Sequence, residues 1–290
     1  MKDLKIVKAI LIILSCFVLG WTIGLVVKRF VVKPPLTILH SNDTHSQMEP
    51  IRSGPDEGLG GLLERAAFVD SVRRADGPDR VLLLHAGDFC QGTTYFSELK
   101  GTVEAQALNA MRYDAVTLGN HEFDNGLEGL GTLLSQVKVP VVVCNYDFSP
   151  FEAGKYIKPF VIVEKAGKKI GIIGVTCSLK SLVSGDTANR LPEFDMIPTV
   201  QKYADLLHPM CDMVIALTHL GYTEHGPGEM TDPQLCAATR NIDLFVGGHS
   251  HTYLDQAAWV KNLDGVQVPI VTAYERGAYV GEMHWYWKNK

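Results

Sequence analysis

Histidines and acidic or amide side chains follow five short apolar runs in this 290-residue chain. The polar residues at these five places are Asp43 and His45, Asp88, Asn120, His219, and His249 and His251. In both pairs the residues are two positions apart, so in an extended segment their side chains face the same way. Oxygen and nitrogen donors together suit zinc, manganese or iron, whereas magnesium and calcium prefer oxygen. The residue types and spacing therefore predict a transition-metal site.

The number of donors predicts two metal ions. Seven ligands are too many for one tetrahedral ion but suit two ions that share a carboxylate. Two divalent ions about 3.5–4 Å apart can activate a hydroxide and hold both oxygens of an in-line displacement. Asp43 and Asp88 neutralise only half the charge of two such ions, so the site favours a phosphate dianion. Any one of these residues could instead be a turn former or cap, and the prediction depends on the whole set.

Strands that alternate with helices would position these residues. Apolar runs predict strands at residues 36–40, 81–85, 115–118, 139–144, 169–176, 213–218, 242–246 and 268–273. One helical face is marked by Leu62, Leu63, Ala66, Val69 and Val72, and a second helix is predicted at 103–111, whereas 181–197 and 221–232 are predicted loops. The alternation indicates an α/β layered fold. In such folds ligands bind beyond the carboxyl ends of strands, which is where the candidate ligands stand.

Composition limits the class of protein. The chain is 46% apolar and 20% charged, enough for a large core, and its net charge is −5. A nucleic-acid-binding protein usually has a basic surface. We therefore expect no nucleic-acid binding.

The first 33 residues differ from the rest. Residues 9–27 contain no charge and are flanked by Lys2, Lys5 and Lys8 on one side and by Lys28, Arg29 and Lys33 on the other. As a helix this run would extend about 28 Å, close to the hydrocarbon thickness of a bilayer. A cleaved signal peptide is the alternative, but it usually has a shorter apolar core and a small-residue cleavage site. We predict a membrane anchor at 1–33 and a catalytic domain at 34–290; the flanking charges leave its orientation open.

The motifs resemble those of a known family. The segments Asp43-x-His45, Gly87-Asp88, Gly119-Asn120-His121-Glu122, His219 and Gly248-His249-Ser250-His251 resemble, in order, the motifs of the calcineurin-like metallophosphoesterases. The longer strings at 38–45 and 119–124 resemble the 5′-nucleotidase branch, and the resemblance extends over about residues 36–287. It implies a four-layer αββα sandwich with two central mixed β-sheets and helices outside.

The resemblance also implies roles for individual residues. Asp43, His45 and His251 would hold one metal ion, Asn120, His219 and His249 the second, and Asp88 would bridge both. Relatives vary at the position of His251, where some have Gln. His121 would be the catalytic histidine, and Asp124 would orient it and favour its charged form. Glu122 is a competing partner for His121, but the family pattern favours Asp124.

The implied function is hydrolysis of a phosphate ester, with a nucleotide as the expected substrate and a metal-bridging hydroxide as nucleophile. Alternatives are a phosphodiesterase or nucleotide-sugar pyrophosphatase, a sulfur-ester hydrolase, and a non-catalytic membrane-tethered partner subunit. Larger 5′-nucleotidases have a second domain that binds the nucleotide, whereas here 268–274 and 276–281 are predicted to be closing strands. A separate chain is expected to supply that domain, unless this domain acts alone. Tyr222, Tyr253 and Tyr274 are candidates to line the cleft, and the branch favours a location outside the cytoplasm.

Overall fold

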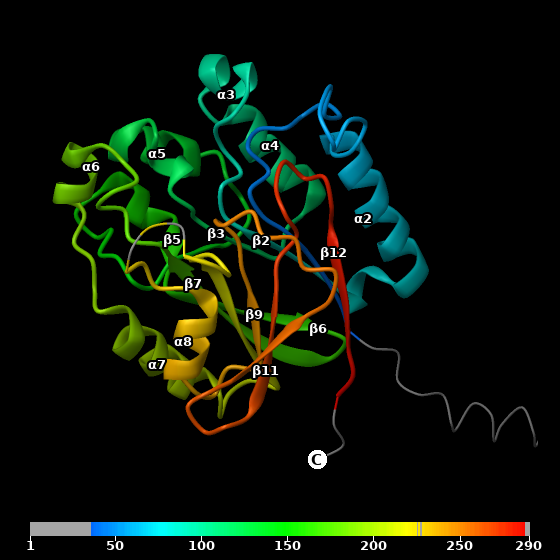
Figure 1. Ribbon diagram of the computed structural model, residues 1–290, viewed down its shortest axis with the longest axis vertical. Helices are drawn as coiled ribbons and strands as arrows, with labels where there is room; N and C mark the ends of the chain where they lie inside the picture. Colours follow the sequence, from blue (N-terminus) through cyan, green and yellow to red (C-terminus); the bar gives the residue numbers. More distant parts are fainter. Residues whose placement is uncertain (1–35, 225, 227, 288–290) are drawn as a thin grey trace, which may run out of the picture. The chain divides into compact units, whose positions relative to one another are not determined.

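Two mixed β-sheets of six strands form the centre of the structure, a computed structural model that describes residues 36–224, 226 and 228–287 (Figure 1). The first sheet has the order β12-β1-β2-β3-β4-β5. Its strands are β1 (Leu36–Ser41), β2 (Val81–Ala86), β3 (Ala115–Thr117), β4 (Val141–Val142), β5 (Ile157–Lys158) and β12 (Gly281–Trp285). Neighbours from β1 to β5 are parallel, and β12 pairs antiparallel with β1.

The second sheet has the order β10-β11-β9-β8-β7-β6. Its strands are β6 (Phe160–Lys165), β7 (Lys168–Thr176), β8 (Met213–His219), β9 (Leu244–Val246), β10 (Ala258–Lys261) and β11 (Gln267–Val271). The four central strands are parallel, and β6 and β10 pair antiparallel with their neighbours. Every residue of β1, β2 and β8 is buried. Parallel strands that are covered on both faces are buried in this way, which explains their mainly apolar sequences.

Helices cover the outer face of each sheet. They are α2 (Leu62–Asp76), α3 (Thr94–Leu99), α4 (Thr102–Met111), α5 (Gly126–Leu134), α6 (Gly185–Arg190), α7 (Met196–Leu207) and α8 (Asp232–Ala238), with short 3₁₀ turns η1 (Pro78–Arg80), η2 (His121–Phe123) and η3 (Glu152–Lys155). Helix α2 contacts β2, α7 contacts β7, and α8 contacts β10 and β11, while the sheets meet through β2 with β8 and β3 with β7. The predicted four-layer α/β sandwich is therefore confirmed.

Several local predictions were wrong. Residues 276–281 do not form a strand: the chain turns at Arg276 and Gly277, whose φ values of 50° and 60° are incompatible with extended backbone, and β12 begins only at Gly281. The predicted loop at 181–197 contains α6 and the start of α7; α6 is a short polar helix without apolar periodicity. Leu63 is 76% exposed, because the buried stripe of α2 runs through Val69 and leaves Leu63 on the other side. Strands β5, β6 and β10 were missed.

The predicted membrane anchor at 1–33 lies outside the described residues. Among the helices that the structure describes, none combines the length and apolar character needed to cross a bilayer. Leu36–Trp285 forms one compact unit, and the domain boundary placed at residue 34 stays a prediction.

Candidate metal centre

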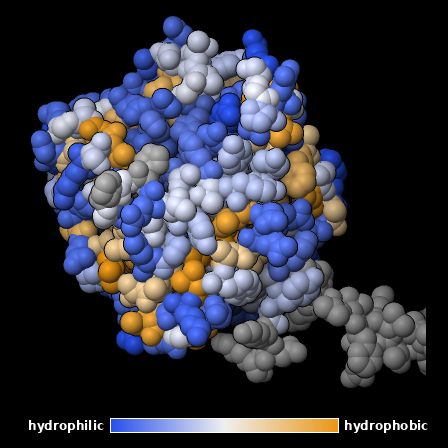
Figure 2. All heavy atoms as spheres, viewed as in Figure 1, coloured by the Kyte–Doolittle hydropathy of each residue, from blue (hydrophilic) through white to orange (hydrophobic). Residues whose placement is uncertain are grey.

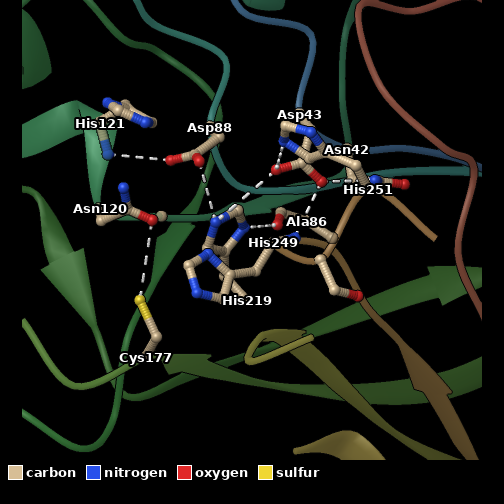
Figure 3. Close-up of polar contacts among 12 residues, drawn as sticks. Asn42, Asp43, Ala86, Asp88, Asn120, His121, Cys177, His219, His249 and His251 are labelled. Atoms are coloured by element: carbon tan, nitrogen blue, oxygen red, sulfur yellow. Dashed lines mark hydrogen bonds and ion pairs between the residues drawn. The ribbon is translucent and has the colours of Figure 1, made fainter. Parts of the chain in front are cut away.

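The carboxyl ends of five strands deliver the predicted ligands to one place (Figure 3). From the first sheet, β1 leads into Asp43 and His45, β2 into Asp88, and β3 into Asn120. From the second sheet, β8 ends at His219, and β9 leads into His249 and His251. The parallel strands of each sheet end on the same side, so the loops of both sheets meet there.

Two groups of potential ligands form at this meeting point. Asp43, His45 and His251 make up the first group, and Asp88, His219 and His249 the second; within each group the ligand atoms lie within 4.8 Å of one another. In the first group His251 Nε2 is 3.5 Å from Asp43 Oδ1 and 3.0 Å from His45 Nε2. In the second, His219 Nε2 is 3.1 Å from Asp88 Oδ2. The members of each group are those that the resemblance assigned to one ion, apart from the amide Asn120.

Asp88 lies between these groups. Besides its place in the second group, it forms a third with His45 and His121. His219 Nε2 is also 3.8 Å from Asp43 Oδ1, which links the two carboxylates across the site. A carboxylate with histidines of both groups around it has the position that a shared ligand requires.

The ligand loops have an unusual backbone. Five of the seven predicted ligands have positive φ values: Asp43 at 47°, His45 at 45°, Asp88 at 53°, His249 at 84° and His251 at 49°. Non-glycine residues rarely adopt this conformation, and each instance costs about 1–3 kcal/mol. Strain of this kind persists where the surrounding structure requires a particular side-chain direction. Ligands that converge on one place have such a requirement.

Glycine allows the Asp88 and Asn120 loops to come close together. A Cβ atom on Gly119 would lie 2.1 Å from Asp88 Oδ1 and 2.6 Å from His219 Nε2. No side chain fits at this distance, so only glycine lets the loop after β3 pass beside these two ligands.

The surroundings of one buried carboxylate oxygen indicate whether these residues suit a cation. Asp43 Oδ2 accepts hydrogen bonds from Asn42 Nδ2 at 2.6 Å and from the His249 amide at 2.9 Å. Asp43 Oδ1 is buried and has no hydrogen-bond partner among the described residues. Imidazole nitrogens surround it at 3.5, 3.8 and 3.9 Å. Because an unsatisfied buried acceptor costs about 1–3 kcal/mol, this oxygen and the nitrogens around it fit a bound divalent ion.

The charges in the site couple strongly. Burial disfavours the charged form of His219, but the carboxylates of Asp88 and Asp43 outweigh this and raise the pKa of His219 to about 10. Burial likewise raises the pKa of Asp88, but the charge of His219 outweighs it and holds that pKa well below its usual range. The two carboxylates therefore favour positive charge at this position, which a divalent cation would also supply.

His121 lies beside Asp88 and His45 and contacts a carboxylate of its own. Its Nδ1 is 3.0 Å from Asp124 Oδ2, three residues on, across the turn η2. Burial lowers the pKa of His121, but the Asp124 hydrogen bond and the charge of Asp88 outweigh it, so the pKa is raised and the charged ring is favoured. Its amide donates to Asp88 Oδ1 at 2.9 Å. Asp124, rather than the competing candidate Glu122, contacts the ring.

Three residues that were not predicted to support the candidate ligands do so. Glu122 points inward, and its carboxylate accepts from the amides of Asp88, Cys90 and Gly119 at 3.0, 3.0 and 2.6 Å. Asn42 holds Asp43, as described above. Glu275 contacts His251 Nδ1 at 2.7 Å. Glu122 was considered only as a partner for His121, and Asn42 stands next to a motif residue; nothing in the sequence connects Glu275 to His251.

The tyrosines predicted as cleft candidates separate into two environments. Tyr222 packs against the hydrophobic core. Tyr253, which is 54% exposed, lies with its ring centroid 6.3 Å from that of Tyr274 and 4.9 Å from that of Tyr279.

A four-layer sandwich with histidines and aspartates gathered at strand ends of both sheets is typical of metal-dependent phosphoesterases. The calcineurin-like phosphoesterase model matches residues 36–253, and the chain belongs to this family. Members of this family use a dinuclear divalent metal site.

Similar proteins and solved structures agree with the assignment of the chain to this family. The chain is 36% identical to a snake venom 5′-nucleotidase from Naja atra, over 86% of the chain and 50% of the relative. It is 35% identical to 5′-nucleotidase from Homo sapiens, over 85% of the chain and 45% of the relative. The structure of a 5′-nucleotidase precursor from Thermus thermophilus superposes with a TM-score of 0.75 at 32% identity, covering 85% of this chain and 50% of that one. The chain thus spans about half the length of the curated relatives it matches.

Proposed function

We propose that the protein is a metal-dependent phosphomonoesterase of the 5′-nucleotidase type that acts on nucleoside monophosphates. The main support for this function is the position of Asp88 between two groups of imidazole and carboxylate side chains, with His121 beside it. The similarity to 5′-nucleotidases from a snake venom and from Homo sapiens supports the substrate class. Zinc, manganese and iron all suit the donor set.

The residues divide into ion-binding and proton-carrying groups. Asp43, His45 and His251 would hold one ion, Asn120, His219 and His249 the other, and Asp88 both. When bound, two divalent ions lower the pKa of an attacking water and neutralise phosphoryl charge. His121, kept charged by Asp124, stabilises the transferring phosphoryl group and gives its proton to the leaving oxygen.

One face of the molecule is mostly polar. The face seen in Figure 2 is largely hydrophilic in its centre and upper part, and apolar residues form small groups toward the lower part and the rim. A hollow of about 280 Å³ includes Gln47, two residues after His45, together with Thr93, Tyr95 and Arg276. It offers room for the part of a substrate that lies beyond the phosphate.

The test is phosphate release from nucleoside monophosphates with added Mn²⁺ or Zn²⁺. We expect turnover that chelation abolishes and added metal restores. A folded, metal-loaded sample that releases no phosphate from any ester would contradict the proposal and favour a non-catalytic partner subunit.

A second candidate reaction is cleavage of a phosphoanhydride in a dinucleotide. It is favoured by the similarity to the structure of NAD nucleotidase from Haemophilus influenzae. That structure superposes with a TM-score of 0.73 at 30% identity, covering 85% of this chain and 46% of that one. NAD in the substrate panel tests this activity, because its two phosphates are joined by an anhydride bond, whereas nucleoside monophosphates report monoester hydrolysis.

We also infer that residues 1–33 anchor the protein in a membrane, with the catalytic domain outside the cytoplasm. The uncharged run at 9–27 supports the anchor. Fractionation tests it: the full chain should remain with membranes in high salt and leave with detergent, and protease added to intact cells should cleave the domain. A chain found in the soluble fraction would contradict the inference.

A further inference from the structure

Glu275 lies on the outer side of a predicted metal ligand. Its Oε2 is 2.7 Å from His251 Nδ1, while the opposite nitrogen of the same ring, Nε2, is 3.5 Å from Asp43 Oδ1. A carboxylate only accepts hydrogen bonds, so the contact requires the proton on Nδ1. In the neutral ring this leaves the lone pair on Nε2, which is the atom that faces the ligand group.

His251 needs such support more than His219 does. His219 is completely buried, and its Nδ1 lies 2.6 Å from the Ala86 carbonyl. The His251 side chain is 36% exposed. The core that fixes the orientation of His219 is therefore absent on one side of His251, and the Glu275 contact takes its place.

The backbone on both sides of Glu275 is bound to the loop that contains Asp43. The Arg276 amide donates to the Asp43 carbonyl at 2.6 Å, and Asn42 Nδ2 donates to the Tyr274 carbonyl at 2.5 Å. Tyr274 and Arg276 have φ values of 66° and 50°, so the segment turns sharply to make both contacts. This arrangement fixes Glu275 relative to the ligand loop rather than leaving it on a free strand end.

The Glu275 carboxylate is also held at its other oxygen. Arg276 Nη2 is 3.4 Å from Glu275 Oε1 and 3.5 Å from Asp56 Oδ2, a buried oxygen without a hydrogen bond among the described residues. The Glu275 side chain is 21% exposed. Its orientation is thus determined from several sides.

We infer that Glu275 is a positioning residue for His251 and sets the affinity of the metal position that His251 serves. A carboxylate that accepts from a ligating imidazole fixes the ring and its tautomer and makes the ring a stronger donor. The inference rests on the proposed metal-dependent function, but it concerns metal binding rather than turnover. Glu275 lies beyond residues 36–253, over which the family model matches.

Titration of the chelator-stripped protein with Mn²⁺, in competition with a fluorescent chelator, tests the inference. In Glu275→Ala we expect one of two dissociation constants to rise about 10–100-fold and the other to stay within about twofold. Glu275→Gln should recover part of the loss, because its amide oxygen still accepts from Nδ1. The matched control is Glu282→Ala, which removes an exposed carboxylate 3.2 Å from His284 Nε2, outside the ligand groups; its metal affinity should equal that of the wild type.

A double-mutant cycle separates positioning of His251 from a general structural effect. In a His251→Ala background, Glu275→Ala should cause no further loss of Mn²⁺ affinity, because the residue through which it acts is gone. Unchanged affinity in Glu275→Ala, or an equal loss in the His251→Ala background, would overturn the inference. Wild-type protein that binds two ions but hydrolyses no ester would overturn the proposed function and leave this inference standing.

Discussion

His121 has a carboxylate at Nδ1, as His251 does: Asp124 contacts the first ring and Glu275 the second. The His121 ring also lies within reach of Asp88 and His45. The proton-donor role of His121 therefore rests on the motif that contains it, and a variant that separates metal binding from turnover tests it.

Replacing His121 distinguishes these roles. His121→Ala should retain close to two metal ions per chain and lose about 10²–10⁴-fold in kcat, the usual contribution of a positioned general acid. Metal analysis and steady-state kinetics on one preparation measure both. Asp88→Ala is the comparison, since loss of the central carboxylate should remove metal as well as activity. If His121→Ala lost metal, the ring would be a ligand and its assigned role would be wrong.

Two further histidines act on stability rather than on chemistry. His40 is 3% exposed, and burial lowers its pKa to about 4; burial lowers the pKa of His85 to about 3. Histidine in an unfolded chain has a pKa of about 6.5. Between these pKa values the unfolded chain binds a proton that the folded chain does not. The contribution of these histidines to the unfolding free energy therefore has its full value above about pH 6.5 and decreases as the pH is lowered.

His40→Gln should weaken this pH dependence. Between pH 7.5 and pH 5, His40 should account for a fall of about 2 kcal/mol in unfolding free energy, at about 1.4 kcal/mol per pKa unit. Urea denaturation of wild type and variant at both pH values, at one metal concentration, measures the difference. His208→Gln, at an exposed position, should behave like the wild type. Equal pH dependence of His40→Gln and wild type would contradict the assignment.

At the scale of elements, the site depends on how closely the loop after β3 approaches the loop after β2 and the end of β8. Glu122 joins the first two loops through the amides of Asp88 and Gly119, and Gly119 leaves space for Asp88 and His219. A shift of one of these loops would separate candidate ligands that come from different elements.

Gly119→Ala should therefore damage the metal site more than the fold. The new methyl group would displace Asp88 and His219, and we expect Mn²⁺ affinity to fall at least about 10-fold, in the range seen when ligand support is lost. Gly185→Ala is the control, because the nearest side-chain atom, Asn189 Nδ2, would be 3.9 Å away. Titration of both variants with Mn²⁺ measures the affinity, and circular dichroism checks that both are folded. A Gly119→Ala variant with wild-type affinity would show that the loops can separate without loss.

At the scale of the whole molecule, the ligands join the two sheets. Asp43 and Asp88 come from the first sheet and His219 and His249 from the second, at one end of the sandwich. Ions held by both would therefore act as cross-links between the halves of the core, and metal binding would contribute to folding stability as well as to catalysis.

Removing the metal should lower the melting temperature. With each ion at about 100 times its dissociation constant the stabilisation is about 2.7 kcal/mol per ion, which for a domain of this size corresponds to roughly 5–10 °C for each ion. Calorimetry of chelator-treated protein before and after addition of Mn²⁺ measures it. Asp88→Ala should show little of this shift, and a melting temperature independent of metal in the wild type would contradict the cross-linking role.

The sequence by itself determined the layered α/β class, the strand ends that bear ligands, and the likeness of the motifs to a family. These features are local: apolar runs specify buried strands, and ligand pairs such as Asp43 and His45 are adjacent in the chain. The resemblance of the motifs implied the two ligand groups and the shared place of Asp88, but only the tertiary structure decided the distances within the groups, the inward position of Glu122 and the contact of Glu275 with His251. Those relations join residues from different strands and sheets, and they depend on loop conformations such as the turn at 274–277 that apolar periodicity does not encode.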